Sequence, residues 1–173
     1  MLDHSITDHL GKYFDLAINH FVNDDSALAV FFAITLIEEC AKILYLRDAN
    51  LKDKEGRRAA IDHSEKHFLA LVNLLSASDR FDALPKQWQD EAWSLFQTKQ
   101  AMRQRNDSLY LRFDKRGRLM APNQVITADH AALLVYLSGF VVYELKEFVD
   151  IEQSWAESIL KRAEVFRAQY LKA

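Results

Sequence analysis

The chain has 173 residues, half of which are hydrophobic, and this is enough for one domain with a substantial core. With four glycines and two prolines it lacks the turn residues of a sheet protein, so the composition excludes a mainly β fold and predicts an all-α fold. A formal net charge of −3 excludes bulk attraction to nucleic acid, and any contact with RNA has to come from a local basic patch.

The N-terminal sequence and the cysteine content bear on the compartment. Residues 1–9 include acids and lack a basic, apolar signal sequence, and the uninterrupted apolar stretches are too short to span a bilayer. We therefore expect a cytoplasmic protein with no membrane association and a single domain over residues 1–173. Cys40 is the only cysteine, which excludes an internal disulfide and a cysteine-based zinc site. A packed thiol is its expected role.

Two helices are predicted in the first part of the chain. The first is amphipathic, with apolar residues at helical spacing: Leu10, Tyr13, Phe14, Ala17 and Phe21. An Asp-Asp-Ser sequence at residues 24–26 predicts the cap of a second helix, which continues to about residue 47. This second helix is apolar on all sides and should lie at the centre of the fold.

Three charged residues interrupt the second helix: Glu38, Glu39 and Lys42. Two carboxylates inside an apolar helix require partners, because an unpaired buried charge is very costly. Lys42 stands three and four residues after the two glutamates and can bridge both. One lysine cannot satisfy two carboxylates, so we expect a further basic or hydrogen-bonding partner from another helix, within residues 103–110.

A polar connection at residues 48–58 leads to the third and fourth predicted helices. The third carries two apolar stripes side by side, the first with Ile61, Phe68, Val72 and Leu75 and the second with His63, His67, Leu71 and Leu74. Pro85 suits the first turn of the fourth helix. Its inward stripe should consist of Trp88, Ala92, Leu95, Met102 and Asn106.

The pattern becomes extended over residues 109–123, with a Lys-Arg-Gly-Arg turn that indicates a small hairpin or an ordered loop. Basic residues gather here and just before: Arg103, Arg105, Arg112, Lys115, Arg116 and Arg118. This run is a candidate RNA-binding patch. The alternative is a merely solvated surface.

Thr127 can cap a fifth helix that is again too apolar for a solvent-facing surface. Ser138 and Gly139 would let another helix approach closely, either within the subunit or from a second copy. Trp155, Ile159, Phe166 and Tyr170 mark a last amphipathic helix, separate from the fifth or continuous with it.

The order of several short sequences resembles a known family. A helix ending in Glu-Glu-Cys-Ala-Lys at 38–42 is followed by Asp-His-Ser-Glu-Lys at 62–66, then by Arg-Asn-Asp-Ser-Leu-Tyr-Leu-Arg-Phe-Asp at 105–114, a turn and Pro122. Over about residues 8–150 this set resembles the AbiV-like abortive-infection family of the HEPN superfamily. The resemblance implies an up-and-down helical bundle, a role in bacterial antiviral defence, and descent from metal-independent ribonucleases that often act as homodimers.

The ribonuclease motif of that superfamily is an Arg, a polar residue, three variable residues and a His. Arg105 and Asn106 match it, whereas Tyr110 stands where the His belongs. Tyrosine, with a pKa of about 10, is a poor base at neutral pH. Our hypothesis is that Arg105 stabilises charge on the phosphate, that Asn106 orients it, and that Tyr110 or His63 transfers the proton.

The remaining site residues follow from these assignments. The supporting polar cluster comprises Glu38, Glu39, Lys42, His63 and Lys66, and the RNA-binding residues are Arg103, Arg112, Lys115, Arg116 and Arg118. Arg105 and Tyr110 point in different directions on an ideal helix, so they converge only if the helix ends near Ser108 or if a second subunit supplies one of them. Otherwise Tyr110 is a buried aromatic.

Several alternatives stay open. His63 and His67 have metal-site spacing, but Lys42 occupies the place where a ligand would be needed beside Glu39, so we expect no metal and no cofactor. The polar cluster can instead serve only to fix helix register. A non-catalytic dimeric module that blocks the translation machinery or senses a phage protein is the alternative function. The expected partners are a second copy, RNA or the translation machinery, and a phage-encoded activator.

Overall fold

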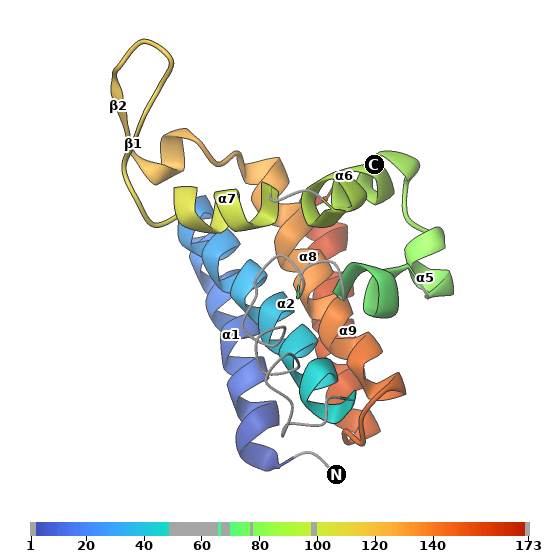
Figure 1. The fold of residues 1–173 in the computed structure, drawn as a ribbon. Helices are drawn as coiled ribbons and strands as arrows, with labels where there is room; N and C mark the ends of the chain where they lie inside the picture. Colours follow the sequence, from blue (N-terminus) through green and yellow to red (C-terminus); the bar gives the residue numbers. More distant parts are fainter. Residues whose placement is uncertain (1–2, 49–65, 67–69, 77, 98–99, 172–173) are drawn as a thin grey trace.

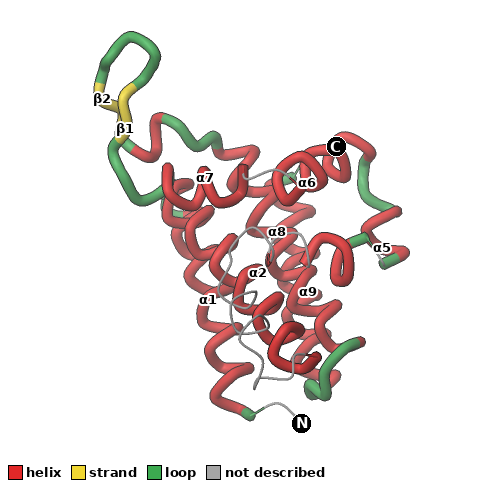
Figure 2. Tube along the Cα trace, viewed as in Figure 1, coloured by secondary structure: helices red, strands yellow, loops and turns green. Residues whose placement is uncertain are grey.

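The computed structural model describes residues 3–48, 66, 70–76, 78–97 and 100–171. Helices dominate these residues, as Figure 2 shows, which confirms the all-α prediction. The elements are α1 (His4–Val22), α2 (Ser26–Asp48), a π-helical turn at Ala70–Leu75, α5 (Asp79–Asp82), α6 (Lys86–Gln97), α7 (Gln100–Asp107), β1 (Arg112–Phe113), β2 (Leu119–Met120), a 3₁₀ turn at Pro122–Gln124, α8 (Ala128–Glu144), a 3₁₀ turn at Leu145–Glu147, and α9 (Gln153–Tyr170).

Four long helices form the body of the part of the chain that the structure describes. α1 packs on α2, α2 on α8, α8 on α9, and α1 also contacts α8 (Figure 1). The amphipathic face predicted for the first helix is confirmed, because Leu10, Phe14 and Ala17 are buried in α1. The capping prediction for α8 is also confirmed, since the Thr127 hydroxyl accepts a hydrogen bond from the backbone N–H of His130. α9 is a separate helix after a 3₁₀ turn.

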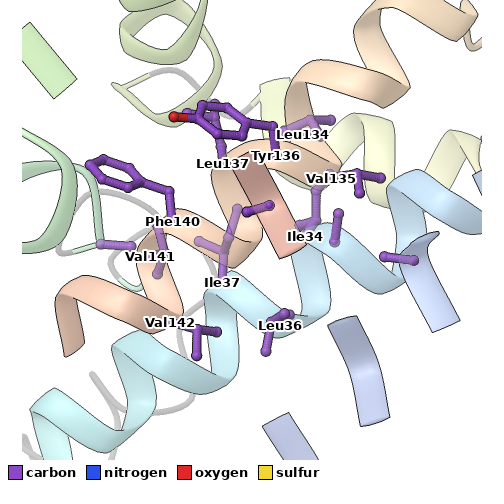
Figure 3. Packing of buried hydrophobic residues seen from close by; sticks show 14 of the residues in the cluster. Ile34, Leu36, Ile37, Leu134, Val135, Tyr136, Leu137, Phe140, Val141 and Val142 are labelled. Atoms are coloured by element: carbon purple, nitrogen blue, oxygen red, sulfur yellow. The ribbon is translucent and has the colours of Figure 1, made fainter. Parts of the chain in front are cut away.

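The centre of the core is the contact between α2 and α8. Figure 3 shows Ile34 and Ile37 of α2 packed among the side chains of α8, including Val135 and Val141. Every residue from 131 to 142 is buried. Among the described residues, one helical stretch, Ala128–Glu147, is long and apolar enough to cross a membrane, and 78% of its apolar window is buried inside the fold. The expectation that every apolar stretch is too short to span a bilayer is therefore wrong for this helix by length and composition, whereas its burial is that of a core helix.

Gly139 allows α8 to approach two other helices inside the subunit. A Cβ atom at this position would lie 2.6 Å from Cζ of Phe14 on α1 and 2.9 Å from Cβ of Ala163 on α9. These distances are shorter than van der Waals contact, so the structure decides between the two readings of Ser138 and Gly139: both are buried within one subunit.

Two glycine-to-alanine substitutions should therefore change the free energy of unfolding in opposite directions. Gly139→Ala should lower the free energy of unfolding by about 1–3 kcal/mol, because the added methyl group overpacks the core. Gly11→Ala in α1 meets nothing closer than 3.8 Å and should raise it by up to about 1 kcal/mol through helix propensity. Urea unfolding of both variants measures the difference, and equal effects would contradict the close approach.

Glu144, near the end of α8, is a buried carboxyl whose oxygen accepts a 2.9 Å hydrogen bond from the Ser78 hydroxyl. Burial raises its pKa above the usual 4.5, and the Ser78 hydrogen bond opposes this only in part. The folded state thus holds this proton more tightly than the unfolded chain, so ionisation costs stability as the pH rises above 4.5. Glu144→Gln should make the protein more stable at neutral pH and remove that decline, as thermal unfolding across pH would show.

The middle of the chain differs in part from the predictions. The third predicted helix is described only at Lys66 and Ala70–Leu75, where Leu74 and Leu75 are buried as expected. The described parts of the fourth are α6 and α7, with Trp88, Ala92 and Leu95 buried. The extended segment is a hairpin, in which Arg112 pairs with Met120 and Phe113 with Leu119. It projects beyond α7, away from the bundle (Figures 1 and 2).

Candidate functional site

The site predicted around the fourth helix lies where α7 packs on α2. α7 ends at Asp107, and the Ser108 hydroxyl donates a 2.6 Å hydrogen bond to the backbone carbonyl of Arg105. The backbone N–H of Tyr110 then bonds to the carbonyl of Asn106 at 3.1 Å. The helix therefore ends just before Ser108, which is one of the two conditions under which the residues of the motif could converge.

Arg105 is the residue that reaches Glu38. Its Nε lies 3.9 Å from Oε2 of Glu38, whose side chain is only 4% exposed. The guanidinium carbon of Arg105 also lies 5.5 Å from the ring centre of Phe31, which is two helical turns before Glu38 on the same face of α2. The second basic partner that the sequence required for the buried acids thus comes from residues 103–110, as expected.

Three further charges surround this pair. Lys42 binds both carboxylate oxygens of Glu39, at 2.5 and 2.7 Å, and this pair is partly exposed. Lys66 is buried, and burial lowers its pKa while the negative charge of Glu38 opposes that shift. Lys66, Lys42 and Arg105 together outnumber the two carboxylates. A group with an excess of positive charge, reached through the partly exposed Arg105, is suited to an anion.

Arg105 retains unused hydrogen-bonding capacity. Its Nε is buried and has no hydrogen-bond acceptor within the part of the chain that the structure describes. The side chain as a whole is 24% exposed, so its remaining N–H groups are not sealed inside the core. A guanidinium anchored on one side by a carboxylate and open on another can donate to a phosphate oxygen.

Two orientations predicted for the motif are wrong. Asn106 was expected on the inward stripe, but it is exposed. Tyr110 is not a buried aromatic, because 65% of it is exposed. Asn106 is exposed because the inward face of α7 runs through Ala101, Arg105 and Ser108, one residue away from the predicted stripe. Tyr110 is exposed because α7 ends at Asp107 and the chain then turns outward towards the hairpin.

The hairpin holds most of the predicted RNA-binding residues on its surface. Arg103, Arg112, Lys115, Arg116 and Arg118 are all exposed. Asp107 pairs with Arg112 at 2.5 Å, and Asp114 pairs with Arg118 at 2.7 Å. The remaining charges face solvent, so the basic patch exists as a surface feature.

His63, the last member of the supporting cluster, lies outside the described residues, as does His67 of the alternative metal site. Among the residues that are described, no group of three or more His, Cys, Asp or Glu side chains could hold a metal ion.

Cys40 is fully buried, and burial raises the pKa of its thiol, as expected for a packed cysteine.

A second polar cluster was not found from the sequence. His130 at the start of α8 has Nδ1 2.5 Å from Oε1 of Glu91 and Nε2 2.6 Å from Oε1 of Gln104, so one ring connects α6, α7 and α8. The cluster opens on a cavity of about 990 Å³ next to α7. No spacing rule indicates it, since its three members come from separate helices. These hydrogen bonds connect α7, which carries Arg105, to α6 and α8.

His130→Ala should therefore loosen α7. We expect the free energy of unfolding to fall by about 1–3 kcal/mol, because Glu91 and Gln104 lose a partner that is largely shielded from water. Gln87→Ala is the matched control, an exposed side chain on the same cavity, and it should change stability by less than about 0.5 kcal/mol. Urea unfolding of both variants tests this. Equal stability of His130→Ala and Gln87→Ala would argue against a stabilising link between α6, α7 and α8 through His130.

A helical bundle with an Arg-Asn pair at the end of a short helix is consistent with the HEPN class. The family model HEPN_AbiV, described as AbiV, matches residues 3–141, which is well over half of the chain. The protein belongs to this family, and the resemblance read from its sequence is confirmed. Family membership indicates an abortive-infection defence protein. Searches of curated proteins and of solved structures found nothing that matches.

Proposed function

We propose that the protein acts on RNA during abortive infection as a metal-independent ribonuclease of the HEPN type. The observation that carries the proposal is the Glu38–Arg105 contact at 3.9 Å, which ties the arginine of the motif to a buried acid. An arginine fixed in this way can bind a phosphate without first losing much side-chain freedom. Such preorganised charge is a major contribution to catalysis in transfer reactions at phosphorus.

In the proposed reaction, the ribose 2′-hydroxyl attacks the adjacent phosphorus and the 5′-oxygen leaves. Arg105 stabilises the negative charge that develops on the phosphate oxygens, and exposed Asn106 orients the strand. The 2′-hydroxyl gives its proton to a base, and the leaving 5′-oxygen takes a proton from an acid. Two described residues are candidates for these roles. Tyr110 lies on the surface at the last position of the motif, and Lys66 is an amine whose pKa is lowered by burial in the charged cluster. His63 remains the third candidate.

The second candidate function is a non-catalytic binding module. Tyr110 in place of histidine favours it, because the side chain that carries the proton in the motif of the superfamily is missing. Such a module would bind RNA, the translation machinery or a phage protein and block it. In both proposals the protein is cytoplasmic, works as a homodimer, and responds to a phage-encoded activator.

One incubation separates the two functions. The purified protein is mixed with bulk cellular RNA in the presence of a chelator, and the RNA is examined on a denaturing gel. Cleavage that survives chelation and disappears in Arg105→Ala supports the ribonuclease. Intact RNA that co-purifies with the protein supports the binder. Intact RNA that does not associate with the protein contradicts both RNA-directed proposals.

A further inference from the structure

The hairpin concentrates exposed apolar side chains to an unusual degree. Of the seven large hydrophobic residues that are exposed in the described part of the chain, five lie between 109 and 119. Their exposed fractions are 40% for Leu109, 65% for Tyr110, 60% for Leu111, 71% for Phe113 and 54% for Leu119. An exposed apolar surface of this kind, beside polar residues, is typical of a binding site.

Hydrogen bonds and one glycine define the turn of the hairpin. The Asp114 carboxylate accepts hydrogen bonds from the backbone N–H groups of Arg116 and Arg118, at 2.8 and 2.9 Å, and from Nε of Arg118 at 2.7 Å. Gly117 has a φ of 76°, a conformation that favours glycine. Phe113 pairs with Leu119 across the two strands, so their side chains share one face of the hairpin.

The base of the hairpin is also fixed to the bundle. The Asn123 side chain accepts a 2.8 Å hydrogen bond from the backbone N–H of Ala27, at the start of α2. At the other end, Arg112 pairs with Asp107, the last residue of α7. The exposed aromatic rings are therefore held in a defined place next to α7, which carries Arg105.

Charge decides what this surface binds. Residues 103–118 contain six cations and two carboxylates, although the whole chain has a formal charge of −3. A symmetric contact would place this basic segment against the same segment of a second copy, and like charges would repel. A polyanion has the complementary charge. Aromatic rings placed among cations are suited to a polyanion whose bases can stack on them.

We propose that the hairpin binds single-stranded RNA, with bases stacked on Phe113 and Tyr110 and phosphates bound by Arg116, Lys115 and Arg103. The inference rests on the proposed function and names its substrate class. Bases stack on a protein ring only when they are not already paired and stacked in a duplex, so the strand must be single. A strand bound here reaches Arg105 at the end of α7, beside the base of the hairpin.

The test measures binding of fluorescein-labelled RNA by fluorescence anisotropy, with the full-length protein and a chelator present. The probe is a short strand of mixed sequence with 2′-O-methyl groups, which offers bases and phosphates but has no 2′-hydroxyl to attack phosphorus. The comparison probe is the same strand annealed to its complement. We expect the single strand to bind at least ten-fold more tightly than the duplex.

Single substitutions in the hairpin test whether the RNA binds there. Phe113→Ala should weaken binding of the single strand by roughly ten-fold or more through lost stacking. Val165→Ala is the matched control, because Val165 is equally apolar and 60% exposed but lies on α9, and it should have no effect. Arg116→Gln should weaken binding a few-fold and reduce the slope of log Kd against log salt concentration by about 0.7. Both hairpin side chains are exposed, so unchanged thermal unfolding confirms that the variants remain folded.

Three results would overturn the proposal: equal binding of strand and duplex, unchanged binding by Phe113→Ala, or no binding by the unmodified protein. If Phe113→Ala leaves binding intact but converts a dimer into monomers in sedimentation, the surface is instead a contact between copies. Cleavage of ordinary RNA is measured separately. If Phe113→Ala leaves cleavage unchanged, the ribonuclease proposal stands and the stacking surface is rejected. If binding depends on Phe113 but no cleavage occurs, the stacking surface stands and the ribonuclease proposal is rejected.

Discussion

If the protein is the proposed ribonuclease, Arg105→Ala should reduce metal-independent RNA cleavage by about 100-fold or more, because the variant would lose the charge proposed to stabilise the phosphate in the transition state. Loss of protection against phage should accompany the loss of cleavage. Arg105→Lys should recover only part of the rate, since lysine keeps the charge but lacks the planar set of donors that can bind Glu38 and a phosphate together. The rates are measured with labelled RNA and a chelator.

Arg103→Ala is the control for this experiment. Arg103 lies on the same helix two residues earlier, but it is exposed and belongs to the surface patch. Its removal should weaken RNA binding and change cleavage at saturating RNA by no more than a few-fold. Equal loss of cleavage in Arg103→Ala and Arg105→Ala would mean that the basic surface acts as a whole and that Arg105 has no special position.

Glu38→Gln should lower the free energy of unfolding by about 3 kcal/mol, because it removes one partner of a buried ion pair and leaves the other charge without compensation. Glu38 is 3% exposed and faces Arg105. Its negative charge also raises the pKa of buried Lys66, so the substitution should lower that pKa further. Denaturant unfolding at neutral pH measures the loss of stability.

Glu39→Gln is the matched control, because the neighbouring glutamate differs mainly in burial. The Glu39 side chain is 26% exposed and its partner Lys42 is 36% exposed, so the pair resembles a surface salt bridge. Such pairs contribute about 0–1 kcal/mol, and Glu39→Gln should fall within that range. If Glu39→Gln proved as damaging as Glu38→Gln, the buried Glu38–Arg105 contact would not be the source of the effect.

The sequence predicted the bundle because its signals are local. Thr127 caps α8, and the apolar residues of α1 recur at helical spacing. The contact between Glu38 and Arg105 could also be predicted from the sequence, since a carboxylate in the middle of an apolar helix needs a basic partner and only a few segments offered one. Energetic necessity, more than any motif, indicated that partner.

Other features depended on tertiary structure. Asn106 was misplaced because the inward face of α7 is shifted by one residue from the predicted stripe, and Tyr110 because α7 ends at Asp107 before reaching it. The connection between His130, Glu91 and Gln104 leaves no mark in the sequence, because three separate helices supply it. The exposed hairpin was recognisable as a turn with basic residues, but the exposure of Phe113 and Tyr110 became visible only in the folded protein.

We expect Glu38 and Arg105 to act as a pair that holds the arginine of the motif in position. A double-mutant cycle of Glu38→Gln and Arg105→Gln, followed by urea unfolding, measures this coupling. The two substitutions should be coupled by about 1 kcal/mol or more, so the double variant loses less stability than the single effects added together. Additive losses would contradict the pairing and with it the structural basis of the proposed site.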